Sequence, residues 1–137
     1  MVELRAQAKH LHWTLVQAEA THDLLDEVAR TAADFADVVA ERMRTLGHAP
    51  EGRTCVVAQH TSLEPLAAAV GDRAMALTSI AGAIAAVERT LDDAEQSTTD
   101  EATRELLTYV ARALTELRWT TTTGTPWARE AHRVAGA

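Results

Sequence analysis

A stripe of apolar residues at helical spacing runs through the middle of the chain, and turn-forming residues separate it from further helical segments. The stripe consists of Leu66, Val70, Leu77, Ile80, Ile84, Val87 and Leu91. Upstream of it, residues 2–16 predict a short first helix. Thr21 is a candidate N-cap for a long second helix that runs to about Leu46, where Gly47 is a natural stop.

The second half of the chain predicts two more long helices after a connector. Residues 53–63 form that connector, which has room for one helical turn. A third helix begins near Glu64 and Pro65, because proline suits the first helical position, and runs to about Ala94. A polar loop follows, and Glu101–Thr121 predicts a fourth helix. These elements predict one four-helix domain over residues 1–127 and a C-terminal tail over residues 128–137.

Composition supports an all-α bundle. The chain has 137 residues, of which 28 are alanine, 5 are aromatic, 6 are glycine and 3 are proline. Alanine, leucine, glutamate and arginine favour helices, whereas strands are enriched in β-branched and aromatic residues. A β-sandwich or barrel is therefore excluded. No glycine-rich phosphate loop or nucleophile-elbow motif occurs, so nucleotide and acyl-transfer chemistry have no support.

The charge balance argues against several partners. The formal net charge is -7 with a pI near 5.3, which disfavours nucleic acid unless a local basic patch overrides it. Charged residues within residues 63–91 argue against a membrane span, and the N-terminal residues lack the apolar core of a secretory signal. A single cysteine, Cys55, forms no intrachain disulfide and is typical of a reducing compartment. We expect a cytoplasmic protein.

Two pairs of potential metal ligands lie on the predicted second helix. His22 and Asp26 are four residues apart, as are Asp37 and Glu41, so each pair shares one helix face. Asp26 and Asp37 are 11 residues apart, which is about 16 Å of helical rise and far beyond the roughly 2 Å bonds around one ion. Within one chain the pairs are two separate half-sites, with His12 as a further candidate ligand.

Antiparallel packing of two copies of this helix brings the first half-site of one copy to the second half-site of the other. The two-fold axis then crosses near Thr31 and Ala32, where small residues permit close approach. These small residues are Ala29, Ala32, Ala33 and Ala36. Carboxylates with imidazoles suit Fe(II), Mn(II) or Zn(II). The alternative is a solvated acidic helix face without a metal, in a helical oligomer.

Four strings in order resemble the Dps family, the mini-ferritins described as DNA-binding proteins from starved bacterial cells. The strings are His10-Leu11-His12-Trp13, His22-Asp23-Leu24-Leu25-Asp26, Ala36-Asp37-Val38-Val39-Ala40-Glu41-Arg42 and Leu46-Gly47-His48-Ala49-Pro50-Glu51-Gly52. The similarity covers roughly residues 5–125, and Leu117-Arg118-Trp119 resembles the family's last-helix tryptophan region. The resemblance implies a ferritin-like four-helix bundle with a short helix or turn in the connector between the second and third helices.

The resemblance also implies a function and a site. Dps proteins are dodecameric hollow shells that oxidise Fe(II), preferentially with hydrogen peroxide, and store ferric mineral, which protects against oxidative stress. The resemblance implies that His22 and Asp26 come from one subunit. It implies that Asp37 and Glu41, with His12, come from the partner subunit and that the site holds up to two iron ions. Trp13 lies beside the site and intercepts one-electron oxidants, or else is a buried aromatic of the bundle.

Three points stay open at the level of sequence. The segment between Trp13 and His22 is two residues shorter than the family's, so Glu19 is an alternative to His22 as ligand. Asp100 and Glu101 either line an iron-access pore at a three-fold axis or serve as helix N-terminal charges. A nucleoid-associated, DNA-protecting shell with little ferroxidase activity is the alternative function, although the acidic charge disfavours it.

Overall fold

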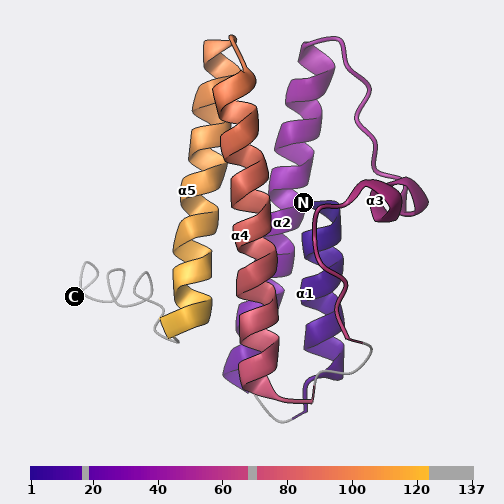
Figure 1. Ribbon diagram of the computed structural model, residues 1–137, viewed down its shortest axis with the longest axis vertical. Helices are drawn as coiled ribbons and strands as arrows, with labels where there is room; N and C mark the ends of the chain where they lie inside the picture. Colours follow the sequence, from indigo (N-terminus) through magenta and orange to yellow (C-terminus); the bar gives the residue numbers. More distant parts are fainter. Residues whose placement is uncertain (17–18, 68–70, 124–137) are drawn as a thin grey trace, which may run out of the picture.

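The protein is an all-α bundle. The computed structural model describes residues 1–16, 19–67 and 71–123, and within these ranges it has five helices and no strand. The helices are α1 (Val2–Thr14), α2 (Glu19–Thr45), α3 (Thr54–His60), α4 (Arg73–Ser97) and α5 (Glu101–Thr123). Figure 1 shows α1, α2, α4 and α5 side by side along the long axis, with the short α3 set to one side of them. The predicted four-helix bundle with a short helix in its connector is confirmed.

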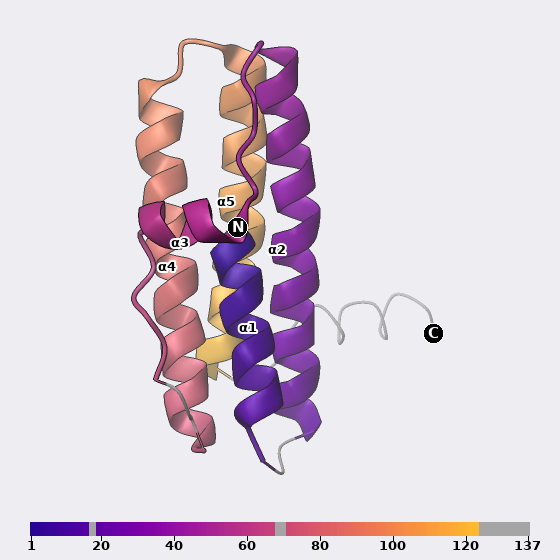
Figure 2. The same cartoon turned by 90° about the vertical axis from the view of Figure 1, so that its right-hand side faces the viewer.

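Two helical hairpins build the bundle. α1 and α2 form the first hairpin and α4 and α5 the second, and α1 also contacts α4 while α2 contacts α5. α1 has 13 residues against 27 in α2, which corresponds to about 20 Å against about 40 Å of helix. Figure 2 shows that α1 therefore runs along only part of the length of α2.

The core lies between the two hairpins. Its fully buried side chains include Leu4, Leu11, Leu25, Ile80 and Leu114. Phe35 of α2 packs edge-on against Tyr109 of α5, with ring centroids 5.8 Å apart. By length and composition, α4 is the one helix in the described ranges that is apolar enough to cross a membrane, and 33% of that apolar window is buried in the bundle.

Several helix ends differ from the prediction. α2 begins at Glu19, so Thr21 is an interior residue with 3% exposure, and its hydroxyl accepts a hydrogen bond from Arg73 Nε at 2.9 Å. The prediction of Thr21 as N-cap is wrong. At the other end of α2, Gly47 has the predicted role: its φ of 83° lets the His48 N–H donate to the Met43 carbonyl at 2.9 Å.

The start of α4 is the largest error of the sequence prediction. α4 begins at Arg73, capped by the Asp72 carboxylate, which accepts from the Ala74 N–H at 2.9 Å, rather than near Glu64 and Pro65. α1 explains the delay, because Gln7 and His10 bind backbone carbonyls of the preceding segment instead of leaving them for helical bonds. We call residues 61–67 the strap. α4 then extends to Ser97, beyond the predicted end at Ala94.

The domain boundary is a prediction that the structure does not test. Residues 17–18, 68–70 and 124–137 lie outside the described residues. The predicted tail, residues 128–137, therefore lies outside them completely.

Candidate metal centre

The packing of α1 against α2 brings three of the predicted ligands, His12, His22 and Asp26, together within a single copy. The His12 and His22 rings meet edge to face with centroids 4.6 Å apart. His12 Nδ1 lies 3.1 Å from Asp26 Oδ1. Because α1 and α2 are antiparallel, the last turn of α1 faces the first turns of α2, and residues ten to fourteen positions apart become neighbours.

Hydrogen-bond partners assign the ring nitrogens of both histidines. His12 Nδ1 faces the Asp26 carboxylate and, at 3.3 Å, the His22 carbonyl; both partners only accept, so Nδ1 carries the proton. His22 Nε2 lies 3.1 Å from the Leu15 carbonyl and is protonated for the same reason. In the neutral rings, His12 Nε2 and His22 Nδ1 are the nitrogens left with a lone pair for a metal. Asp26 orients His12 as carboxylates commonly orient metal-binding histidines.

Lys9 is part of this half-site, and the sequence analysis missed it. Its Nζ lies 2.7 Å from Asp26 Oδ1 and 5.9 Å from the centroid of the Trp13 ring. The hydrogen bond from Lys9, with the positive charges of Lys9 and Arg30 nearby, lowers the pKa of Asp26 below its ordinary value. Its spacing in the sequence could have indicated this position. The chain's only lysine stands three residues before His12 and four before Trp13, so a helix places all three on one face.

Trp13 lies on the surface beside the half-site. It is 71% exposed in a single copy, so the alternative of a buried bundle aromatic is wrong for this position. Val16, two residues past the end of α1, is also 71% exposed. An exposed tryptophan next to an exposed valine is a surface that association with another molecule would cover.

Asp37 and Glu41 lie apart from the first half-site. Both are exposed on α2, and in the described ranges neither has a hydrogen bond or an ion pair. Along one continuous helix, Asp37 lies about 16 Å from Asp26, as predicted, and Glu41 lies about 22 Å from it. Across residues 1–16, 19–67 and 71–123, no three His, Cys, Asp or Glu side chains of one copy are arranged to hold a metal ion. Within the described part of one copy, neither group of predicted ligands forms a complete metal site.

The grouping of His12 with Asp37 and Glu41 is corrected. His12 contacts Asp26 and His22 of its own chain, so it groups with these two residues rather than with Asp37 and Glu41. Glu19 is exposed at the start of α2, whereas His22 lies against the His12 ring. Of the two alternatives, His22 is therefore the residue that lies beside His12.

The alanines of α2 do not all face outward. Ala29 and Ala32 are 5% and 0% exposed and belong to the chain's own core. Of the predicted contact residues, Ala33 and Ala36 are half-buried and stand on the side that also carries Asp37. A close approach of two α2 helices would therefore rest on Ala33 and Ala36.

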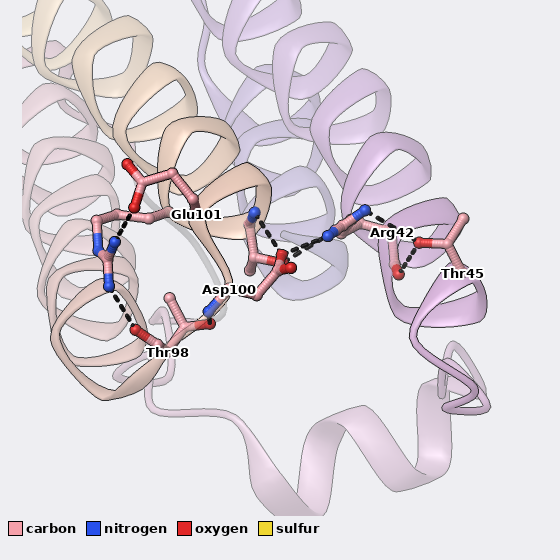
Figure 3. A network of polar contacts seen from close by, with 7 residues as sticks. Arg42, Thr45, Thr98, Asp100 and Glu101 are labelled. Atoms are coloured by element: carbon pink, nitrogen blue, oxygen red, sulfur yellow. Dashed lines mark hydrogen bonds and ion pairs between the residues drawn. The ribbon is translucent and has the colours of Figure 1, made fainter.

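Asp100 and Glu101 are engaged within the chain, as Figure 3 shows. The Asp100 carboxylate accepts from the Thr103 N–H at 2.8 Å and from its hydroxyl at 2.5 Å, and it pairs with the Arg42 guanidinium. Glu101 pairs with Arg104. Asp100 therefore caps α5 and ties it to α2. These contacts favour the helix N-terminal interpretation over a pore lined by free carboxylates.

Asp100 predicts a specific pH dependence. Hydrogen bonds from Thr103 and Arg42 lower the pKa of Asp100 from 3.8 to about 2. A lowered pKa means that the charged form stabilises the fold above about pH 4, and this contribution is lost as pH falls through about 2. Asp100→Asn keeps a capping side chain but removes the charge. We expect the Asp100→Asn variant to unfold at a lower temperature at pH 7 and the difference from wild type to shrink below pH 4, measured by circular dichroism; a constant difference would contradict the assignment.

A solved structure of Dps from Microbacterium arborescens in its high-iron form matches with a TM-score of 0.79 and 27% identity, over 87% of this chain and 80% of that one. A DNA protection during starvation protein of Mycolicibacterium smegmatis is 36% identical over 52 residues. The chain is Dps-like.

The other comparisons cover less of the chain. The fine tangled pili major subunit of Haemophilus ducreyi is 48% identical over 52 residues. Both curated matches span 36% of this Dps-like chain and 28% of the relative's length. No family model matches the chain. The Dps resemblance therefore rests on the fold over most of the chain and on sequence over about a third of it.

Proposed function

We propose that this Dps-like chain binds Fe(II) at sites formed between two copies, oxidises it with hydrogen peroxide and stores the ferric product inside a hollow homo-oligomer. The observation that carries the proposal is the pair of incomplete half-sites on α2, one with His12, His22 and Asp26 and the other with Asp37 and Glu41. Two antiparallel copies would complete two such sites. The likeness to a Dps structure in a high-iron form supports iron as the metal.

The donor set suits this chemistry. The first half-site offers two imidazole nitrogens and a carboxylate, and the second offers two carboxylates, a mixture that divalent iron accepts. One hydrogen peroxide molecule takes one electron from each of two Fe(II) ions and, with two protons, becomes two water molecules. Oxidising the ions in pairs breaks the O–O bond without releasing hydroxyl radical. Two ions held together in one site therefore account for protection from peroxide.

Lys9 would compete with the metal in the metal-free protein. Its ammonium already occupies Asp26 Oδ1 at 2.7 Å, so an arriving cation has to displace it or share the carboxylate with it. Trp13 lies where the displaced ammonium can rest against the ring. Lys9 thus lowers the affinity of the half-site while keeping Asp26 charged.

Lys9→Met should tighten metal binding. One positive charge about 4 Å from a divalent ion costs about 2 kcal/mol in water-like surroundings, so we expect about a 30-fold lower Kd for Mn(II) or anaerobic Fe(II). Isothermal titration calorimetry measures it. Arg5→Met, which removes an exposed charge one turn earlier on α1, is the matched control and should leave the Kd unchanged. Weaker binding by Lys9→Met would mean that Lys9 positions Asp26 rather than competing with the metal.

The function itself is tested by adding Fe(II) anaerobically to purified protein and then hydrogen peroxide. We expect ferric absorbance to rise much faster than in buffer, with two Fe(II) consumed per peroxide, and the iron to elute with a high-mass assembly on gel filtration. Oxidation no faster than in buffer, with no iron retained, would reject the proposal.

The name of the Mycolicibacterium relative favours a second candidate, a DNA-protecting shell with weak oxidation. The acidic net charge of -7 disfavours direct contact with phosphate, although divalent cations bridge acidic surfaces to DNA. A gel shift at low salt with and without Mg(II) separates the cases. We expect no retention of DNA without Mg(II).

A further inference from the structure

Glu19 and Arg44 stand at opposite ends of α2, on the side that carries Asp26 and Asp37. Each helical residue turns the chain by about 100°, so these four residues fall within about 20° of one line along the helix. Glu19 and Arg44 are exposed, and neither side chain has a hydrogen bond or an ion pair among the described residues. Figure 2 shows α2 along one edge of the bundle. The line thus ends in two opposite charges that the described part of one copy leaves unpaired.

The two charges are placed symmetrically about the axis that the proposed metal site requires. A two-fold axis brings two residues of antiparallel helices opposite each other when both lie equally far from the axis along the helix. The axis that joins the two groups of proposed ligands crosses α2 between Thr31 and Ala32. Glu19 lies as many residues before this point as Arg44 lies after it. The register that completes the metal site therefore places Glu19 of each copy opposite Arg44 of the other, at both ends of the pair.

The spacing of two such helices suits long side chains at their ends. Helices in contact lie about 8 to 10 Å apart, and the half-buried Ala33 and Ala36 permit the lower value. A crossing angle of about 20° moves the helices about 7 Å further sideways at points about 19 Å from the crossing, so their axes are about 11 Å apart there. Glutamate and arginine together are long enough to meet across this gap.

We propose that Glu19 and Arg44 form two equivalent ion pairs between two copies of this chain and set the register in which the iron site forms. The inference rests on the proposed function, which supplies the two-fold axis. In the same register Asp26 of one copy lies opposite Asp37 of the other, and these carboxylates repel each other until a cation joins them. The two ion pairs attract in metal-free protein, so they hold the register before the metal arrives.

Charge reversal in two separate variants tests the pairing between copies. Two Glu19→Arg copies would face each other with arginines at both ends, and two Arg44→Glu copies would face each other with glutamates. Each variant alone should therefore raise the Kd of the metal-free two-copy complex at least about tenfold, because two exposed pairs change from attraction to repulsion. In a mixed pair, opposite charges meet at both ends, so an equal mixture of the two variants should recover the wild-type Kd. Sedimentation of the full chain over a dilution series at low salt measures it.

Two controls separate the ion pairs from general charge effects. Glu105→Arg and Arg112→Glu reverse an exposed glutamate and an exposed arginine of α5, and they should leave the Kd unchanged. The effect of each α2 variant should also shrink in about 1 M salt, where charges are screened beyond about 3 Å.

An equal mixture that dissociates as readily as either variant alone would overturn the inference. Glu19 and Arg44 would then only complement the dipole of their own helix, which places acids at the start and bases at the end. If that mixture fails while wild type still oxidises iron, this inference alone falls. If the mixture recovers the Kd while wild type oxidises iron no faster than buffer, the proposed function falls and the ion pairs remain.

Discussion

Replacing Asp37 and Glu41 together by Asn and Gln will slow peroxide-driven Fe(II) oxidation by about 100-fold or more. Residues that hydrogen-bond to metal ligands typically contribute 10- to 100-fold to metal affinity or activity. Removing two carboxylates that would bind the metal directly should therefore slow oxidation by at least the upper end of that range. Both side chains are exposed and make no hydrogen bond or ion pair within the described part of one copy, so the substitutions should leave the fold intact. Stopped-flow absorbance of the ferric product measures the rate.

Asp34→Asn is the matched control for this loss. Asp34 is an exposed acid of the same helix, one turn from Val38, and takes no part in either half-site. We expect its oxidation rate to equal that of wild type. If the Asp34 variant lost as much of the oxidation rate as the Asp37 and Glu41 double variant, the acidic charge of the helix would attract iron in general. The result would then not indicate a specific metal site at Asp37 and Glu41.

The second large effect concerns stability. Leu25→Ala should lower the free energy of unfolding by about 2 to 5 kcal/mol, because a fully buried leucine is replaced and its cavity is only partly refilled. The total free energy of unfolding of a typical domain is only about 5 to 15 kcal/mol, so this is a severe loss of stability. Urea unfolding at a fixed protomer concentration measures it, since assembly adds to stability.

Leu46→Ala is the control for Leu25→Ala. Leu46 is 44% exposed just past the end of α2, and its truncation should cost less than about 0.5 kcal/mol. Similar losses for the two variants would show that Leu46 is covered by another copy in the assembled protein. The comparison thus also reports on assembly.

Local signals in the sequence were enough to predict the fold class. The apolar stripe around Ile80 and Ile84 is the buried face of α4, and Gly47 ends α2 by adopting a positive φ. These features depend on neighbours within one or two helical turns. The separation of Asp26 from Asp37 also follows from helical rise alone, so the two half-sites could be predicted before the structure.

The remaining features depend on contacts between segments. α4 starts late because Gln7 of α1 binds the strap, a partner 57 residues away that no local pattern reveals. His12 lies with Asp26 rather than with Asp37 and Glu41 because α1 packs against the first turns of α2, a contact that no local pattern reveals. Lys9 was overlooked because its role is visible only once Asp26 lies across from it.

The most direct test of the shared site is to co-express two inactive variants. One carries His12→Gln and Asp26→Asn, the other Asp37→Asn and Glu41→Gln, with different affinity tags. In a mixed two-fold pair, one site would receive both damaged halves and the other both intact halves. Random pairing at equal amounts makes half of the pairs mixed, so the account predicts about a quarter of wild-type oxidation from two nearly inactive parents. Mixed assemblies as inactive as either parent would contradict a site shared between copies.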